Sequence, residues 1–147
     1  MCSSDLRTNY YINVPSNALE LALFLESDRM GYLIDTMTPK TVDAQRDVVK
    51  NERRQSYENR PYGLAEPTID EMLYPEKHPY HWPVIGYMPD LTAASHEDVV
   101  EFFRKYYTPS NASLVVAGDI DPAKTRTLVE KWFGDVKPGP RAEPMTV

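Results

Sequence analysis

The sequence predicts a domain in which helices cover a β-sheet, of the α/β or α+β class. Two segments rich in β-branched and aromatic residues, TNYYINV at residues 8–14 and SLVVA at residues 113–117, are typical of strands. Much of the remaining chain carries apolar residues at helical spacing, separated by prolines, glycines and capping residues. With 147 residues, 41% of them hydrophobic, the chain is long enough for one domain core.

Three helices are expected in the first half of the chain. The first covers residues 17–33, where Asn17 begins a capping-box pattern. The second follows a cap at Thr41 and covers residues 42–59, until a proline interrupts the pattern. A short helix is expected at residues 67–74. These helices would cover the sheet that begins with the first predicted strand.

The second half begins with an irregular segment. Residues 75–89 contain four prolines and several aromatic residues, so they are expected to form a loop that packs on a surface or frames a site. A helix capped by Thr92 or Ser95 follows, with a row of apolar residues on one side. After the strand at 113–117, Asp121 and the proline behind it are typical of the start of a last helix.

Composition excludes several classes of partner. The net charge of −6 gives no electrostatic basis for binding nucleic acid or an anionic membrane. Cys2 is the single cysteine, so neither an intrachain disulfide nor a thiolate-rich zinc site is possible. The segment MCSSDL at residues 1–6 does not blend into the strand behind it and looks like a translated sequencing adapter. We therefore expect residues 1–6 to be a non-native leader.

Glu52 is the main candidate for a functional residue. On the helix at 42–59, Gln45, Val48, Val49 and Glu52 share one face, and the two valines predict that this face points inward. The opposite face carries cationic residues that can stay in water: Arg46, Lys50, Arg53 and Arg54. A carboxylate on an inward face requires a cation, a hydrogen-bond network or a metal ion. The alternative is a Glu at the helix edge that pairs with an arginine.

The histidines give a weaker metal signal. His78 and His81 bracket a proline and a tyrosine, and Pro79 prevents the helix that would direct both rings to one ion. Because no acidic or cysteine residue lies at a matching spacing, packing within the loop is the expected role of both rings. The sequence also lacks a serine nucleophile elbow and a glycine-rich phosphate loop, so nucleophilic and nucleotide chemistry have no support.

The string QRDVVKNERRQSYENRPYG at residues 45–63 resembles the insulinase/pitrilysin metallopeptidases of bacteria. These are inverzincins, in which an upstream helix carries the zinc-binding motif HxxEH. The resemblance covers almost everything after Leu6, including residues 8–30, 78–91 and 102–120. Several long matches in the right order are more specific than any short motif.

The resemblance implies a mixed, largely antiparallel sheet covered by helices, truncated at its N-terminus. It implies that Glu52 is the third zinc ligand and that Gln45, in place of a second acidic residue, lies in the shell around the metal. No HxxEH occurs in the 147 residues, so the two histidine ligands and the catalytic glutamate are expected upstream, and no catalytic residue is assigned here. Residues 7–90 would complete the zinc-binding region, and residues 91–147 would begin the next region, with a truncation or linker at 137–147.

The function that the resemblance implies is zinc-dependent endopeptidase activity, with Zn²⁺ as cofactor and a peptide or protein as substrate. The expected partner is a second homologous lobe, in the same chain or in a partner subunit, and the 147 residues alone are expected to be inactive. Relatives of this Tyr- and Pro-rich character are often exported, which favours the periplasm. The alternative is a non-catalytic homologue with a structural or partner-binding role.

Overall fold

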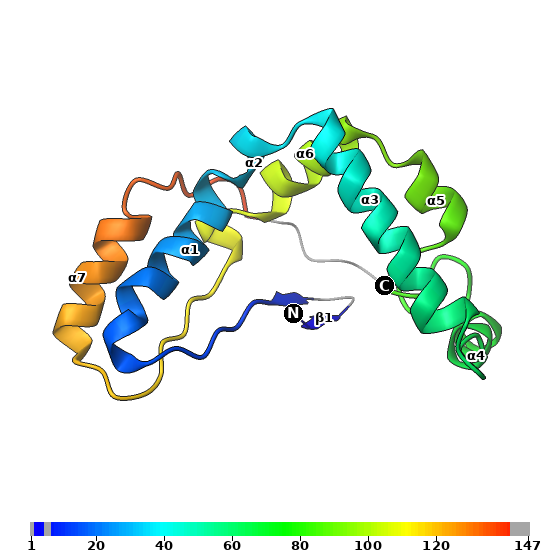
Figure 1. Cartoon of the computed structure of the whole chain (residues 1–147), viewed down its shortest axis with the longest axis horizontal. Helices are drawn as coiled ribbons and strands as arrows, with labels where there is room; N and C mark the ends of the chain where they lie inside the picture. Colours follow the sequence, from blue (N-terminus) through cyan, green and yellow to red (C-terminus); the bar gives the residue numbers. More distant parts are fainter. Residues whose placement is uncertain (1, 5–6, 142–147) are drawn as a thin grey trace. The chain divides into compact units, whose positions relative to one another are not determined.

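A computed structural model describes residues 2–4 and 7–141, and the regular secondary structure of this part of the chain is almost entirely helical, joined by long loops (Figure 1). Its helices, including short 3₁₀ segments and one π-helical turn, are η1 (Ser16–Ala18), α1 (Leu19–Gly31), α2 (Leu33–Thr36), α3 (Pro39–Arg53), η2 (Arg54–Glu58), α4 (Ala65–Leu73), α5 (Met88–Ala93), α6 (His96–Tyr106), η3 (Pro109–Asn111) and α7 (Pro122–Phe133). Two strands, β1 (Cys2–Ser4) and β2 (Arg7–Asn9), pair antiparallel, with Ser3 opposite Thr8.

The predicted α+β class, with a mixed, largely antiparallel sheet, is wrong. Within the described residues the sheet consists of β1 and β2 alone. Residues 10–14 and the whole of 113–117 form no strand, and Val115 is 83% exposed. Strand-forming residues build a sheet only where a neighbouring strand supplies hydrogen bonds and covers the side chains, and among the described residues neither segment pairs with such a strand.

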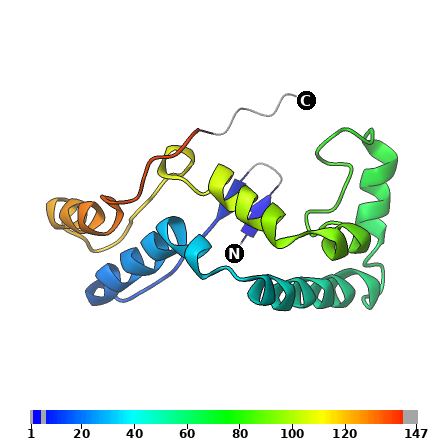
Figure 2. The ribbon, with the colours of Figure 1, turned by 90° about the horizontal axis from the view of Figure 1, so that it is seen from above.

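The chain divides into two compact units, which are described separately. One comprises Tyr11–Met37 and Glu97–Pro144, and in it α1 and α7 lie side by side (Figures 1 and 2). Leu23 of α1 is 3% exposed, and the ring of Phe24 meets that of Trp132 edge to face at 5.1 Å. At the surface, Lys131 donates to the Glu20 carboxylate at 2.6 Å. An apolar contact with a charged rim therefore joins the two helices.

The C-terminal helix α7 begins and ends where the sequence predicts, whereas α1 does not begin with the predicted cap. Asp121 caps α7, since its carboxylate accepts from the backbone N–H groups of Ala123 and Lys124, and Gly134 ends the helix as predicted. The capping box predicted at Asn17 does not form, because a 3₁₀ turn precedes α1 and its N-cap residue is Ala18.

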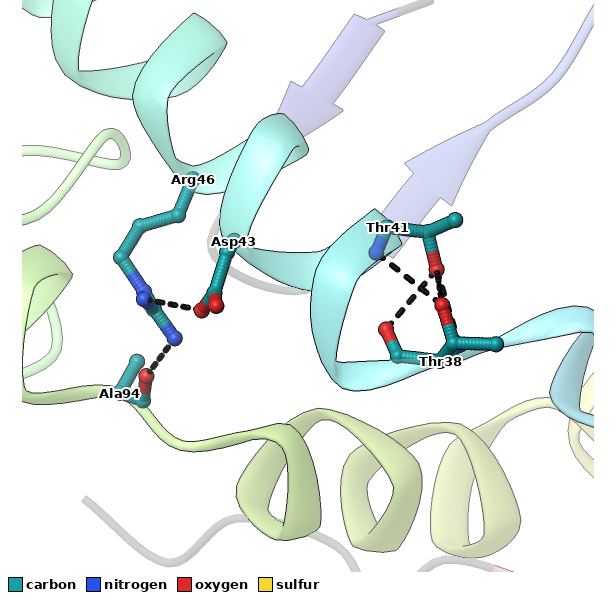
Figure 3. Close-up of polar contacts among 5 residues, drawn as sticks. All are labelled: Thr38, Thr41, Asp43, Arg46 and Ala94. Carbon is teal, nitrogen blue, oxygen red and sulfur yellow. Dashed lines mark hydrogen bonds and ion pairs between the residues drawn. The ribbon is translucent and has the colours of Figure 1, made fainter.

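The other unit comprises Met1–Tyr10, Thr38–His96 and Met145–Val147, of which Met1, residues 5–6 and residues 145–147 lie outside the described part. Its long helix, α3, lies along α5 (Figure 1). Thr38, and not the predicted Thr41, is the N-cap: each threonine hydroxyl accepts from the backbone N–H of the other (Figure 3). This reciprocal pair begins the helix one turn earlier than predicted.

Three further observations concern predicted segments. Helix α4 matches the short helix predicted at 67–74, and α6 begins directly after Ser95, one of its two predicted caps. None of the helices in the described residues has the length and apolar character needed to cross a membrane. The predicted leader at residues 1–6 lies partly outside the described residues.

Candidate metal-binding helix

Two arginines form the packed face of α3. Arg53 donates through Nε to the carbonyl of Gly86 at 3.1 Å, and Arg46 donates to the carbonyl of Ala94 (Figure 3). Gly86 and Ala94 flank α5, so side chains seven residues apart on α3 hold both ends of the neighbouring helix. The Arg53 side chain is only 11% exposed, and that of Arg46 is 21% exposed and also paired with Asp43 at 2.7 Å.

The prediction that the Gln45–Glu52 face of α3 points inward is therefore wrong. Gln45, Val48 and Glu52 are exposed, whereas Val49 is half-buried on the arginine side. The physical reason is that long arginine stems cover apolar surface while their guanidinium groups satisfy backbone carbonyls. Gln45 and Glu52 form a second stripe with the same seven-residue spacing, next to the arginine stripe but open to solvent.

Glu52 is free to accept a ligand. It lies in the last turn of α3, and within residues 2–4 and 7–141 no hydrogen bond or ion pair engages its carboxylate. No group of three His, Cys, Asp or Glu side chains in that part of the chain converges as a metal site requires. Glu52 can therefore supply one oxygen ligand to a metal, with Gln45 on the same stripe, but cannot bind zinc with structural-site affinity by itself.

A π-helical turn, η2, directly follows the Glu52 turn. The backbone N–H of Asn59 donates to the carbonyl of Arg54 at 2.8 Å, a five-residue step. The guanidinium of Arg53 forms an ion pair with the Glu58 carboxylate at 3.3 Å and lies 6.0 Å from the Tyr57 ring centre. The sequence predicts a continuous helix through this stretch. The opposite charges of Arg53 and Glu58, five residues apart, are the one signal in the sequence that favours a π-helical turn.

The segment that follows η2 packs closely against the η2 backbone. A Cβ on Gly63 would lie 2.2 Å from the carbonyl oxygen of Tyr57, so only glycine fits there. Tyr62, just before it, has a φ of 58° and is 93% exposed, which is an unusual backbone conformation for a bulky residue. An open depression adjoins this segment, lined by Tyr57, Glu58, Arg60, Tyr62, Gly63, Leu64, Ala65, Thr68 and Ile69.

The loop before α5 confirms the packing role predicted for its histidines. His81 contacts the carbonyl oxygen of Tyr74 through Nδ1 at 2.8 Å, and His78 accepts from the backbone N–H of Tyr80 at 3.1 Å. The His78 ring stacks on Tyr74 with centroids 4.7 Å apart. The same loop ends at Tyr87, whose hydroxyl donates to Glu71 at 2.5 Å, and this bond raises the pKa of Tyr87.

Comparison with known proteins decides the family. Residues 93–147 match the family model described as the Peptidase M16 inactive domain. The zinc protease PqqE of Helicobacter pylori is 33% identical over 130 residues, and the alignment covers 88% of this chain and 29% of that protein. The crystal structure of a protease from Helicobacter pylori superposes with a TM-score of 0.80 at 32% identity, covering 88% of this chain and 31% of that one. The chain belongs to the insulinase/pitrilysin (M16) peptidase family.

Other M16 relatives are similar to this chain over a comparable length. The probable zinc protease PqqL of Haemophilus influenzae is 30% identical over 135 residues, which cover 89% of this chain and 14% of that protein. The chain thus spans less than a third of each of these curated relatives. Glu52 and Gln45 precede the segment matched by the inactive-domain model, so that description concerns a different part of the chain.

Proposed function

We propose that this chain supplies Glu52 as a ligand to the zinc ion of an M16 metalloendopeptidase that hydrolyses peptide bonds. The observation that carries the proposal is the open stripe of α3. A carboxylate without a partner among the described residues lies there beside Gln45, held outward by the arginines that pack the neighbouring stripe. The family membership and the zinc proteases among its relatives support the same role.

Zinc fits the residues present. Carboxylate oxygen is an ordinary zinc ligand, and an exposed carboxylate can turn toward an ion without breaking an existing contact. Gln45 can donate a hydrogen bond to a ligand or to water near the metal, because its amide carries two N–H bonds. A zinc ion bound there would lower the pKa of its water and polarise the scissile carbonyl.

The remaining zinc ligands and the general base are proposed to lie in sequence beyond these 147 residues. The chain contains no HxxEH motif and spans 29% of the Helicobacter pylori zinc protease. We propose a peptide or protein substrate and a second homologous lobe as partner, and we expect the 147 residues alone to be inactive. Chelator-sensitive proteolysis by the purified 147-residue chain would overturn this assignment.

The direct test compares two acidic residues of α3 in the complete gene product. Glu52→Gln should abolish peptidase activity and weaken zinc binding, because an amide is a poor zinc ligand. Asp47→Asn is the matched control, since Asp47 is an exposed acidic residue of the same helix outside the Gln45–Glu52 stripe. Equal zinc affinity in the wild type and the Glu52→Gln variant would refute the role of Glu52.

A non-catalytic homologue is the second candidate, because the family model matching residues 93–147 is described as an inactive domain. In that case the exposed Glu52 would serve a structural or partner contact and bind no metal. The coding sequence upstream of this segment distinguishes the two. An HxxEH motif there supports the peptidase, and a complete upstream region without one supports the non-catalytic homologue.

A further inference from the structure

The ion pair between Arg53 and Glu58 spans the π-helical turn η2 and fits its geometry. In an α-helix, residues five apart lie about 140° from each other around the axis, so their side chains point to different sides. In a π-helical turn the five-residue step brings them onto one face. Their separation of 3.3 Å is thus a property of η2, and the pair opposes the return of this turn to α geometry.

Other contacts hold the same turn from outside. Arg53 Nε donates to Gly86 at 3.1 Å, which fastens the beginning of η2 to the loop before α5. Gly63 lies against the Tyr57 carbonyl so closely that no side chain fits. Isolated π-helical turns are uncommon and occur frequently at functional sites. Here the turn begins two residues after Glu52.

Within the described part of the chain, no hydrogen bond or ion pair fixes the direction of the Glu52 carboxylate. The direction of its carboxylate therefore depends on the backbone conformation of the last turn of α3. That conformation depends in turn on the contacts of the residues that follow Glu52. Among the described residues the side chain of Arg54, two positions after Glu52, bonds only within its own turn, to Asn51 Oδ1 at 2.8 Å on the exposed side. Of the two adjacent arginines, only Arg53 links the Glu52 turn to the rest of the unit.

We infer that Arg53 and Glu58 are positioning residues for Glu52: their ion pair across the π-helical turn fixes the direction in which the carboxylate meets the metal. This inference rests on the proposed function, and it adds a role for residues that do not themselves touch the metal. Outer partners of metal ligands typically change metal affinity by about 10- to 100-fold. A loss of that size is expected when the pair is broken.

The test measures zinc affinity of the complete gene product by competition with a chromogenic chelator, a readout independent of activity. Glu58→Gln and Arg53→Lys should each raise the zinc Kd by about 10- to 100-fold. Arg54→Lys is the matched control and should leave it unchanged. Because Arg53→Lys can also loosen the fold, each variant is paired with a thermal melt, and Glu58→Gln, at a partly exposed site, is the decisive variant.

A double-mutant cycle separates positioning from a general structural effect. If Glu58 acts through Glu52, then Glu58→Gln should have no further effect on zinc affinity once Glu52 is already Gln. Wild-type affinity in Glu58→Gln, or an equal loss with and without Glu52, would overturn the inference and leave the role of Glu52 intact. Unchanged affinity in Glu52→Gln would instead refute the proposed function.

Discussion

The contact between α1 and α7 and the contact between α3 and α5 are built from different chemistry. The first buries apolar side chains, Leu23 and the Phe24–Trp132 pair, with a charged pair at its edge. The second relies on two arginines that reach backbone carbonyls at the ends of a short helix. The comparison teaches that an apolar stripe identifies the packed face of α1, whereas on α3 two arginines bind the neighbouring helix and the half-buried Val49 lies on their side.

The largest expected effect is at Leu23, which is almost fully buried. Leu23→Ala should destabilise the α1–α7 unit by about 2–5 kcal/mol, the range for a truncated core leucine. Because the chain has two tryptophans, a Trp82→Phe background lets Trp132 fluorescence report urea unfolding of this unit alone. Leu21→Ala, at a 57% exposed position of the same helix, is the control and should stay within about 0.5 kcal/mol. A small effect at Leu23 would mean that the apolar contact is not what holds α1 to α7.

Arg53 should come next. Arg53→Met removes charge-assisted hydrogen bonds to Gly86 and Glu58 and should cost about 1.5–3 kcal/mol. Arg54→Met, at the neighbouring exposed position, should change stability by no more than about 0.5 kcal/mol. Urea unfolding followed by Trp82 fluorescence in a Trp132→Phe background reports on this unit. If both substitutions lower the free energy of unfolding by the same amount, then Arg53 does not hold α3 to its neighbour, and α3 no longer differs from α1 in how it packs.

The start of α3 gives a smaller effect. Thr38→Ala removes the hydroxyl that accepts from the Thr41 N–H and should destabilise the helix by about 1 kcal/mol. Thr36→Ala is the control, since its hydroxyl donates to the Leu33 carbonyl on the surface and caps no helix N-terminus. Far-UV circular dichroism during urea unfolding measures both. Equal stability of the two variants would contradict the capping role.

The smallest effect concerns the charged rim of the α1–α7 contact. The hydrogen bond and charge of Lys131 hold the pKa of Glu20 below its ordinary value of 4.5. Glu20 therefore contributes stability above about pH 4.5, and this contribution is lost as the pH falls through its lower folded-state pKa. Lys131→Met should flatten the decline in stability below pH 4.5, measured by unfolding at pH 3.5 and 6. An unchanged pH dependence would show that the pair is fully solvated.

The two ends of α7 were predicted correctly because their causes are local, although the caps predicted at Asn17 and Thr41 were not. Asp121 caps α7 through N–H groups two and three residues away, and the sequence shows all of these groups together. The direction of Glu52 was read wrongly because it depends on contacts of Arg53 and Arg46 with residues 33 and 48 positions away. The spacing of apolar residues along a helix does not indicate which side chains bind backbone carbonyls in a distant loop.

The predicted strands were mostly wrong for a related reason: of their residues, only Thr8 and Asn9 lie in a strand, β2. The segments at 8–14 and 113–117 have the right residue types, but a sheet needs pairing that no single segment encodes. The family was accessible from long matching strings, as the comparisons confirm. The zinc-ligand role of Glu52 remains a prediction, and the π-helical turn beside it was not anticipated.

The exposed segment SLVVA at residues 113–117 has a consequence for handling the protein. It combines strong β-propensity with no charge and no proline, and Val115 presents 83% of its surface to solvent. Such a segment offers free backbone N–H and C=O groups to an identical segment of another molecule. Aggregation of the isolated chain should therefore increase steeply with protein concentration. Val115→Lys would place a charge in this segment and oppose cross-β association, while leaving α3 unchanged.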